Sequence, residues 1–229
     1  MPESLHLSTI SKRAIDIGGA LIGLILSAPI MLLISLLIWI KAGRPILYRE
    51  SRIGLNQKPF RLYKFRSMAS GNGYHEASVA SGDDVRILSF GHFLRNTHLD
   101  ELPQLWHVLK GDMSLIGPRP YKPSHFKRLP EASRQIIASV KPGLSGADAL
   151  LFIAEDKALK GLKNPEAVYL DCFLPEKATQ QIQYIQTQSI QRDLRLITRT
   201  LCALFSRRTR QNSIRYLRRL YRNKDKPKK

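Results

Sequence analysis

Residues 93–120 read FLRNTHLDELPQLWHVLKGDMSLIGPRP. Apolar residues recur here at helical spacing, so we expect a helix that is capped by Asn96 or Thr97. Asp100 and Glu101 then lie in its N-terminal turn. Consecutive helical residues diverge by about 100° around the helix axis, which allows the two carboxylates to hold different roles.

Two interpretations of this acid pair are open. Acidic residues in a first helical turn complement the helix dipole. Alternatively, a carboxylate can attack phosphorus and form an acyl phosphate, which divides one difficult displacement into two easier steps. The stretch also supplies Arg95, Lys110 and Arg119 close to the acids. Acids surrounded by bases favour phosphate chemistry.

The composition limits the class of protein. A chain of 229 residues can bury one good core, so a single domain is expected. The formal net charge is +19, which attracts polyanions such as nucleic acid, an anionic membrane surface or phosphorylated substrates. Residues 206–229 carry about half of this excess. Cys172 and Cys202 are too few for a disulfide framework or a zinc site, which fits a reducing cytoplasm.

A second informative stretch, residues 17–40, contains twenty-four residues without a charge. A straight helix of this length covers about 36 Å, enough for a hydrocarbon core of about 30 Å. Lys12 and Arg13 precede it and further basic residues follow it, although a spanning helix would export one basic flank. Pro29 removes a backbone donor, and Ser27 can bond back to a carbonyl one turn earlier. The stretch is either a kinked spanning helix or a re-entrant helix that breaks at Ser27 and Pro29.

Residues 60–65 alternate apolar and basic side chains, a pattern that predicts a short extended segment with one wet face. Lys64 lies on that face, and Arg66 follows directly. These two cations either contact substrate phosphate or belong to a face that meets solvent and lipid headgroups.

Near the end of the chain, apolar residues at helical spacing predict an amphipathic helix. The apolar positions are Ile190, Leu194, Ile197, Leu201 and Leu204 or Phe205. Such a helix packs either on a soluble core or in a membrane interface. Beside a membrane segment the interface is favoured, because arginines on the other faces gain from anionic lipid.

The 93–120 stretch resembles the core signature of the bacterial sugar transferases, the small monotopic polyprenyl-phosphate phosphoglycosyl transferases. The resemblance extends over about residues 11–205. It implies an α+β, mostly helical fold: a re-entrant N-terminal membrane hairpin and a cytoplasmic catalytic domain with interfacial amphipathic helices. The domains would be an N-terminal segment at 1–43 with its membrane helix at about 17–40, a catalytic domain at 44–205 and a basic tail at 206–229.

The same resemblance implies a reaction. A sugar-1-phosphate would pass from a UDP-sugar to a polyprenyl (undecaprenyl) phosphate, with release of UMP, as the first membrane step of surface glycan or glycoconjugate assembly. Asp100 would attack phosphorus and form a covalent phospho-sugar intermediate, while Glu101 orients the site, the metal or the acceptor. Mg²⁺ is the expected cofactor, with Asp100 as a ligand, because a divalent cation neutralises the repulsion between the phosphates and the carboxylate.

Substrate contacts follow from the same comparison. Arg119 belongs to a Gly-Pro-Arg-Pro block that lies at the nucleotide-sugar site of the family, and two flanking prolines restrict its backbone. Lys64, Arg66 and Arg95 are expected to contact substrate phosphate, with a structural role for Arg95 equally open. Residues 147–150 read ADAL where the family continues differently, so the wall nearest the sugar is expected to diverge.

The expected location is the cytoplasmic face of the bacterial inner membrane, with membrane lipids as further partners. Nucleic acid is not expected as a partner, and the sequence leaves open the oligomeric state, the sugar and the glycan pathway. One alternative is a non-catalytic basic membrane adaptor that binds anionic lipid or nucleic acid. Another is a degenerate transferase that binds its donor without turnover. The intact Asp100-Glu101 pair and Arg119 favour an enzyme over both.

Overall fold

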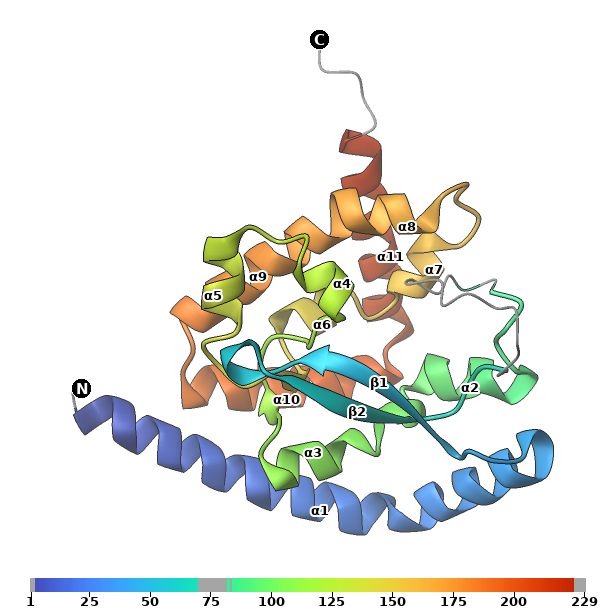
Figure 1. Cartoon of the computed structure of the whole chain (residues 1–229), viewed down its shortest axis with the longest axis horizontal. Coiled ribbons are helices and arrows are strands. Elements are labelled where there is room, and N and C mark those ends of the chain that lie inside the picture. The colour runs from blue at the N-terminus through green and yellow to red at the C-terminus, as the bar shows by residue number, and fades with distance from the viewer. Residues whose placement is uncertain (1–2, 70–81, 83, 225–229) are drawn as a thin grey trace.

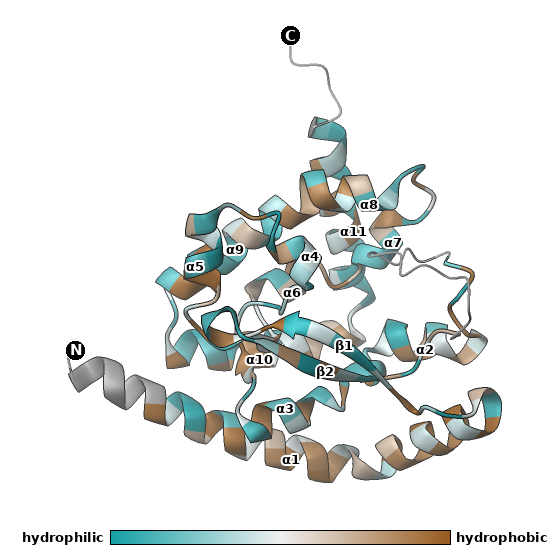
Figure 2. Ribbon diagram, viewed as in Figure 1, coloured by the Kyte–Doolittle hydropathy of each residue, from teal (hydrophilic) through white to brown (hydrophobic). Residues whose placement is uncertain are grey.

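A single long helix, α1 (Glu3–Ala42), forms one edge of the molecule in the computed structural model, which describes residues 3–69, 82 and 84–224 (Figure 1). Its segment Ile10–Ala42 is long and apolar enough to cross a membrane. Large apolar side chains stay exposed along it, including Leu26 at 76% and Leu32 at 73%. Figure 2 shows this helix as the most continuously hydrophobic element. These features make α1 the candidate for membrane insertion.

The expected break at Ser27 and Pro29 needs correction, because α1 is one continuous helix with Pro29 in its interior. The helix bends without turning back on itself (Figure 1). Loss of one backbone donor at proline is enough to kink a helix without ending it. Ser27 Oγ donates to the carbonyl of Leu24 at 3.5 Å, whereas the sequence indicated the carbonyl of Gly23.

Both arms of α1 pack against the rest of the protein. In the first arm, Ala20 is fully buried in a cluster with Val108 and Met113. In the second arm, Ile38 is fully buried beside Phe65. These two contacts lie on either side of Pro29, so the bent helix packs against the rest of the protein along both arms.

Two strands form an antiparallel ribbon, β1 (Leu47–Ile53) and β2 (Pro59–Phe65), in which Tyr48 pairs with Lys64. The connection includes the short helix η1 (Leu55–Gln57). The extended segment predicted from the alternation at 60–65 is therefore confirmed. A second, parallel pair joins β3 (Ser114–Ile116) to β4 (Gly143–Ser145). The mostly helical α+β class is confirmed as well.

Short helices make up most of the remainder. They are α2 (Ser89–Thr97), η2 (Leu99–Glu101), α3 (Gln104–Lys110), α4 (Pro123–Phe126), α5 (Glu131–Ile137), α6 (Ala147–Leu151), α7 (Glu155–Leu159), α8 (Pro165–Val168), η3 (Tyr169–Phe173) and α9 (Leu174–Gln186). The largest buried cluster joins α9, η3, α7 and their neighbours, and its members include Phe173 and Leu159. This core fixes the elements above the ribbon and thereby one wall of the site.

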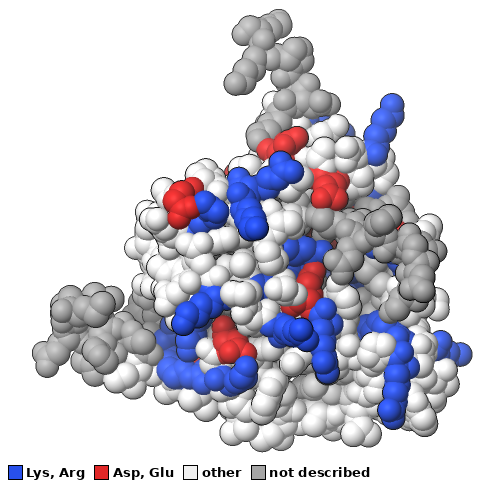
Figure 3. Space-filling model, in the orientation of Figure 1, with Lys and Arg blue, Asp and Glu red and all other residues white. Residues whose placement is uncertain are grey.

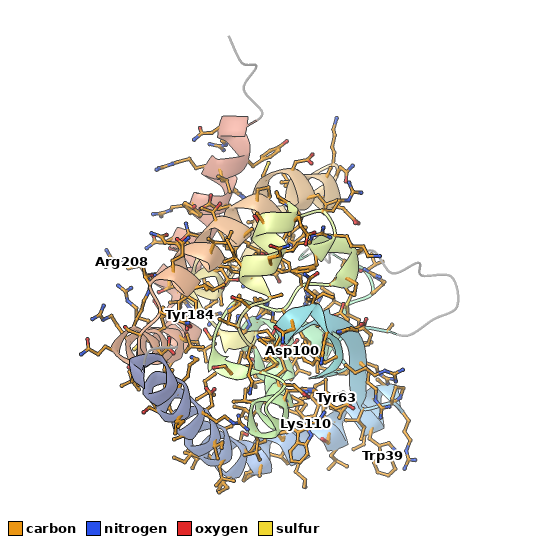
Figure 4. All side chains as sticks on the ribbon, turned by 60° about the vertical axis from the view of Figure 1, so that its left-hand side comes forward. Trp39, Tyr63, Asp100, Lys110, Tyr184 and Arg208 are labelled. Atoms are coloured by element: carbon orange, nitrogen blue, oxygen red, sulfur yellow. The ribbon has the colours of Figure 1, made fainter. Side chains whose placement is uncertain are left out.

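Two helices close the chain, α10 (Ile190–Phe205) and α11 (Arg207–Lys224). On α10, Leu196 is buried while Leu194 and Leu201 are 48% and 57% exposed. The predicted amphipathic helix exists, and part of its apolar stripe faces outward. Much of the predicted basic tail forms α11, which buries Leu217 in the main core and leads away from α1 (Figure 1). Arg208, at its beginning, points outward (Figure 4).

Candidate functional site

A tight turn between two helices holds the acid pair. His98 ends α2 in the left-handed conformation, with φ 57°, and the single turn η2 then carries Asp100 and Glu101. The expected helix therefore begins later, at Gln104. Thr97 does not cap it, because its Oγ1 donates backward to the Phe93 carbonyl at 2.7 Å. The left-handed residue turns the chain sharply enough to direct both carboxyl groups inward.

Both acids line a cavity of about 1130 Å³ in the middle of the molecule. Figure 4 places Asp100 in the interior, between the β-ribbon and the helices above it. All of the predicted substrate-binding cations line the same cavity, namely Lys64, Arg66, Arg95 and Arg119. The structure thus brings together residues that lie up to 55 positions apart in the sequence, from 64 to 119. On the face shown in Figure 3, Lys and Arg side chains gather over β1 and β2.

Glu101 is held by two cations. Lys64 Nζ donates to its Oε1 at 2.9 Å, and Arg119 donates to both carboxylate oxygens, with 3.1 Å between Nη1 and Oε2. Burial alone would raise the pKa of Glu101, but the charges of Arg119 and Lys64 hold that pKa well below its ordinary value. Glu101 is therefore a permanent anion that fixes the positions of two cations.

Asp100 is in a different state, although it is the next residue. It is 7% exposed, and its carboxylate has no hydrogen bond or ion pair with any residue that the structure describes. Burial raises its pKa to about 6, and the negative charge of Glu101 acts in the same direction, against the attraction of Lys64. At neutral pH this group is an ionised, poorly solvated carboxylate, which is more basic and more nucleophilic than an ordinary one. The two adjacent acids therefore occupy different environments, and their difference in role stays a prediction.

The other predicted cations differ in how far they are already engaged. Arg66 donates to the carbonyls of Ala42 and Gly43, so it ties the end of α1 to the cavity wall. Arg95 makes only a long contact of 3.9 Å from Nη1 to the sulfur of Met68, and its Nε has no partner among the described residues. Of these two, Arg95 has more capacity left to bind an anion.

The backbone carbonyl of Arg119 is bound by Gln181, which Asp148 holds in turn, and neither residue was predicted for the site. Gln181 Nε2 donates to the Arg119 carbonyl at 3.3 Å and to Asp148 Oδ2 at 2.7 Å. Asp148 is 1% exposed, and its carboxylate holds the amide group that binds the Arg119 carbonyl. Asp148 lies in residues 147–150, where the sequence departs from the family pattern, and this departure was the only feature of the sequence that pointed to Asp148. Gln181 gave no signal.

The residues present fit Mg²⁺ only in part. Among residues 3–69, 82 and 84–224, no three His, Cys, Asp or Glu side chains gather into a metal site. Mg²⁺ is commonly held by one or two carboxylates together with substrate phosphates. Asp100 fits such a role because its carboxylate is uncommitted, whereas Glu101 is already engaged by two cations.

Another part of the cavity lining is apolar and comes from α1, α10 and their neighbours. Its lining residues include Ile22, Gly23, Leu26, Leu105, Ile197, Leu201 and Leu204. The cavity therefore has a cationic region around Asp100 and Glu101 and an apolar region beside α1, the helix that is the candidate for membrane insertion. Such a cavity suits two substrates, one rich in phosphate and one with a hydrocarbon chain.

Comparisons with known proteins agree with this chemistry. The profile of the bacterial sugar transferase family matches residues 7–207. The chain is 37% identical over 199 residues to a UDP-glucose:undecaprenyl-phosphate glucose-1-phosphate transferase of Caulobacter vibrioides, covering 85% of this chain and 70% of the relative. It is 42% identical over 147 residues to a putative undecaprenyl-phosphate N-acetylgalactosaminyl 1-phosphate transferase of Bacillus subtilis, covering 64% of this chain and 80% of the relative. A UDP-N-acetylgalactosamine-undecaprenyl-phosphate N-acetylgalactosaminephosphotransferase of Aeromonas hydrophila is 40% identical over 139 residues, which are 59% of this chain and 32% of that protein.

Proposed function

The chain belongs to the bacterial sugar transferase family, and from this membership we propose that it transfers a sugar-1-phosphate from a UDP-sugar to undecaprenyl phosphate and releases UMP. It is an enzyme of the sugar-1-phosphate transferase class. The relatives act on different sugars, glucose in some and N-acetylgalactosamine in others, so their names leave the sugar of this chain open.

The reaction proceeds in two displacements at phosphorus. An Asp100 oxygen attacks the β-phosphorus of the UDP-sugar, the bond to the bridging oxygen breaks, and UMP leaves. A phosphate oxygen of the polyprenyl phosphate then attacks the phosphorus of the acyl phosphate and releases the Asp100 carboxylate. The observation that carries the proposal is the contrast within the pair: an uncommitted, buried Asp100 beside a Glu101 that is held by two cations.

Glu101 acts in this scheme by positioning cations. Lys64 and Arg119 stay close to the attacked phosphorus because Glu101 anchors both of them. The two cations stabilise the negative charge that develops on the phosphoryl oxygens. Arg95, with its partly unused guanidinium, contributes to binding the diphosphate.

Mg²⁺ would be held by Asp100 together with the donor phosphates. When bound, such a cation supplies charge neutralisation and alignment of the phosphoryl group. The residues of the chain that act beside it are those already described: Asp100 provides the attacking oxygen, and the anchored cations orient the diphosphate.

The apolar side of the cavity accommodates the polyprenyl chain of the acceptor. It opens beside α1, whose exposed apolar surface enters the cytoplasmic leaflet of the bacterial inner membrane. Two groups of contacts support a helix that enters and leaves the same face. Lys12 pairs with Asp193 at one end of the apolar segment, and Arg66 binds the carbonyls of Ala42 and Gly43 at the other. One domain thus holds both ends of the helix, which a spanning helix would separate by a bilayer.

The proposal is tested by release of UMP from a panel of UDP-sugars. The assay uses detergent-purified full-length protein with Mg²⁺, with and without undecaprenyl phosphate. We expect acceptor-dependent release with at least one sugar, loss of release in Asp100→Asn, and near-normal release in the matched control Asp112→Asn, because Asp112 pairs with Lys110 outside the cavity lining. Folded protein that releases no UMP from any donor would contradict the proposal and favour the alternative of a basic adaptor.

A further inference from the structure

A second polar group lines the same cavity and includes neither Asp100 nor Glu101. Lys177, on α9, is 7% exposed and forms an ion pair with Glu155, the first residue of α7. Its ammonium also lies 4.9 Å from the ring centroid of Phe152 and 4.9 Å from that of Tyr169. All four residues line the cavity. The reaction scheme above uses none of them.

The charge balance of this group differs from that around Asp100. Near Asp100, the cations Lys64, Arg95 and Arg119 share the cavity with two acids, and substrate phosphates suit that excess of positive charge. Lys177 and Glu155 neutralise each other in one ion pair, so this pair carries no net charge. It offers hydrogen-bond donors and acceptors beside two aromatic rings. This combination fits the hydroxyl groups and apolar C–H faces of a sugar better than it fits a phosphate.

The two regions are adjacent. Lys177 and Gln181 are four positions apart on α9, so they lie on one face of the helix, about one turn of 5.4 Å from each other. Gln181 in turn donates to the Arg119 carbonyl. The group around Lys177 is therefore adjacent to Arg119, one of the cations proposed above to bind the diphosphate, and the hexose of a nucleotide sugar is attached directly to that diphosphate.

We propose that the Lys177–Glu155 pair, with Phe152 and Tyr169, forms the subsite for the hexose ring of the donor and discriminates between UDP-sugars. The inference rests on the proposed function. The ammonium donates to a hydroxyl or acetamido oxygen of the hexose, and the Glu155 carboxylate, whose side chain is 18% exposed, accepts from a hydroxyl. A hexose that lacks the matching group leaves this buried pair incompletely hydrogen-bonded, which is a strong basis for discrimination.

The test compares the wild type with the double variant Lys177→Met/Glu155→Gln. Both charges are removed together, because removing one would leave the other buried and unpaired. The assay measures kcat/KM for UDP-glucose, UDP-galactose, UDP-N-acetylglucosamine and UDP-N-acetylgalactosamine, together with inhibition by UMP. We expect the preference between the best and second-best donor to change by about tenfold or more, on the scale of one lost hydrogen-bond contact. Inhibition by UMP should stay within about twofold.

Two further variants guard against misfolding and nonspecific effects. Lys177→Arg alone keeps both charges and the rings but changes the geometry of the donors, so it should also shift the preference between donors and serves if the double variant does not fold. Lys163→Met removes an exposed lysine outside the cavity lining and should leave the preference unchanged.

The outcomes separate this inference from the proposed function. Dissociation constants for the same donors are measured in parallel, so sugar discrimination is decided even for a protein that releases no UMP. An unchanged preference in both variants would overturn the inference while leaving the enzyme class intact. A rise in the UMP inhibition constant that parallels the loss of donor binding would also overturn it, because the pair would then bind the nucleotide.

Discussion

Replacing Asp100 by asparagine should make the protein more stable while it inactivates the enzyme. The reason is the environment of the carboxylate, which is 7% exposed and has no hydrogen-bond or ion-pair partner among the described residues. Burial raises its pKa from 3.8 to about 6. One pKa unit corresponds to about 1.4 kcal/mol, so holding this charge in the folded state costs about 3 kcal/mol above pH 6.

The sign of the pH dependence follows from linkage. Because the folded-state pKa lies above the unfolded one, the stability contributed by protonated Asp100 is complete below pH about 4 and is lost as the pH rises through about 6. Asparagine is neutral throughout. The gain in Asp100→Asn should therefore be largest at pH 8 and shrink as the pH falls from 6 toward 4.

The assay is the thermal unfolding midpoint of purified wild type and variant between pH 4 and pH 8. For a chain of 150–250 residues, 1 kcal/mol shifts the midpoint by about 2–4 °C, so we expect a gain of about 6–12 °C at pH 8. Asp112→Asn is a control of opposite sign: against the effect of its partial burial, hydrogen bonds with His107 and Lys110 lower the pKa of Asp112. That variant should lose stability at pH 8. A gain in Asp100→Asn that does not vary with pH, or a loss at pH 8, would show that the buried charge of Asp100 does not limit stability.

Three further predictions follow from the same contacts. In the wild type, kcat/KM for UMP release should fall about tenfold per pH unit below pH 6, because protonated Asp100 cannot attack the donor phosphorus. A kcat/KM that stays constant down to pH 4.5 would contradict this prediction. Glu101→Gln should lower the free energy of unfolding by about 3 kcal/mol or more, because Lys64 and Arg119 lose the anion that they share. Denaturant titration measures the change, and an unaltered unfolding midpoint would show that Glu101 does not hold these two cations. Gln181→Met should raise the KM for the donor about tenfold, because the variant no longer binds the carbonyl of Arg119, and it should have little effect on the KM for the acceptor. Equal changes in the two KM values would indicate a general structural role for Gln181.

Part of the site could be predicted because its signals are local. Asp100, Glu101 and Arg119 lie within one stretch of 28 residues, where an acid pair, bases and a proline-flanked arginine occur together. The strand that carries Lys64 was also predicted from its alternating side chains, because alternation reports one buried face without knowledge of the partner strand.

Other parts depend on contacts between distant positions. The Lys64–Glu101 pair joins residues 37 positions apart, and Gln181 meets Arg119 across 62. In a chain with 37 lysines and arginines, no pattern distinguishes Lys177 from the others before the fold places it beside Glu155. Such pairings arise from tertiary packing and have no period in the sequence.

The continuous form of α1 shows where a local rule was overridden. Pro29 predicted a break, but packing of Ala20 and Ile38 on either side of it stabilises both arms as one bent helix. Proline lowers the local stability of a helix, and tertiary contacts decide whether the chain turns or only bends.

The proposed mechanism requires that Asp100 carries the sugar-1-phosphate covalently after it reacts with the donor. The most direct test is a single-turnover reaction without acceptor, in which full-length protein is mixed with a UDP-sugar labelled at the β-phosphorus and the protein is analysed by mass spectrometry. We expect one sugar-1-phosphate on the peptide that contains Asp100, lost on treatment with hydroxylamine or undecaprenyl phosphate, and absent from Asp100→Asn. Transfer to the acceptor at a normal rate with no label on the protein, or with label on another residue, would contradict this mechanism.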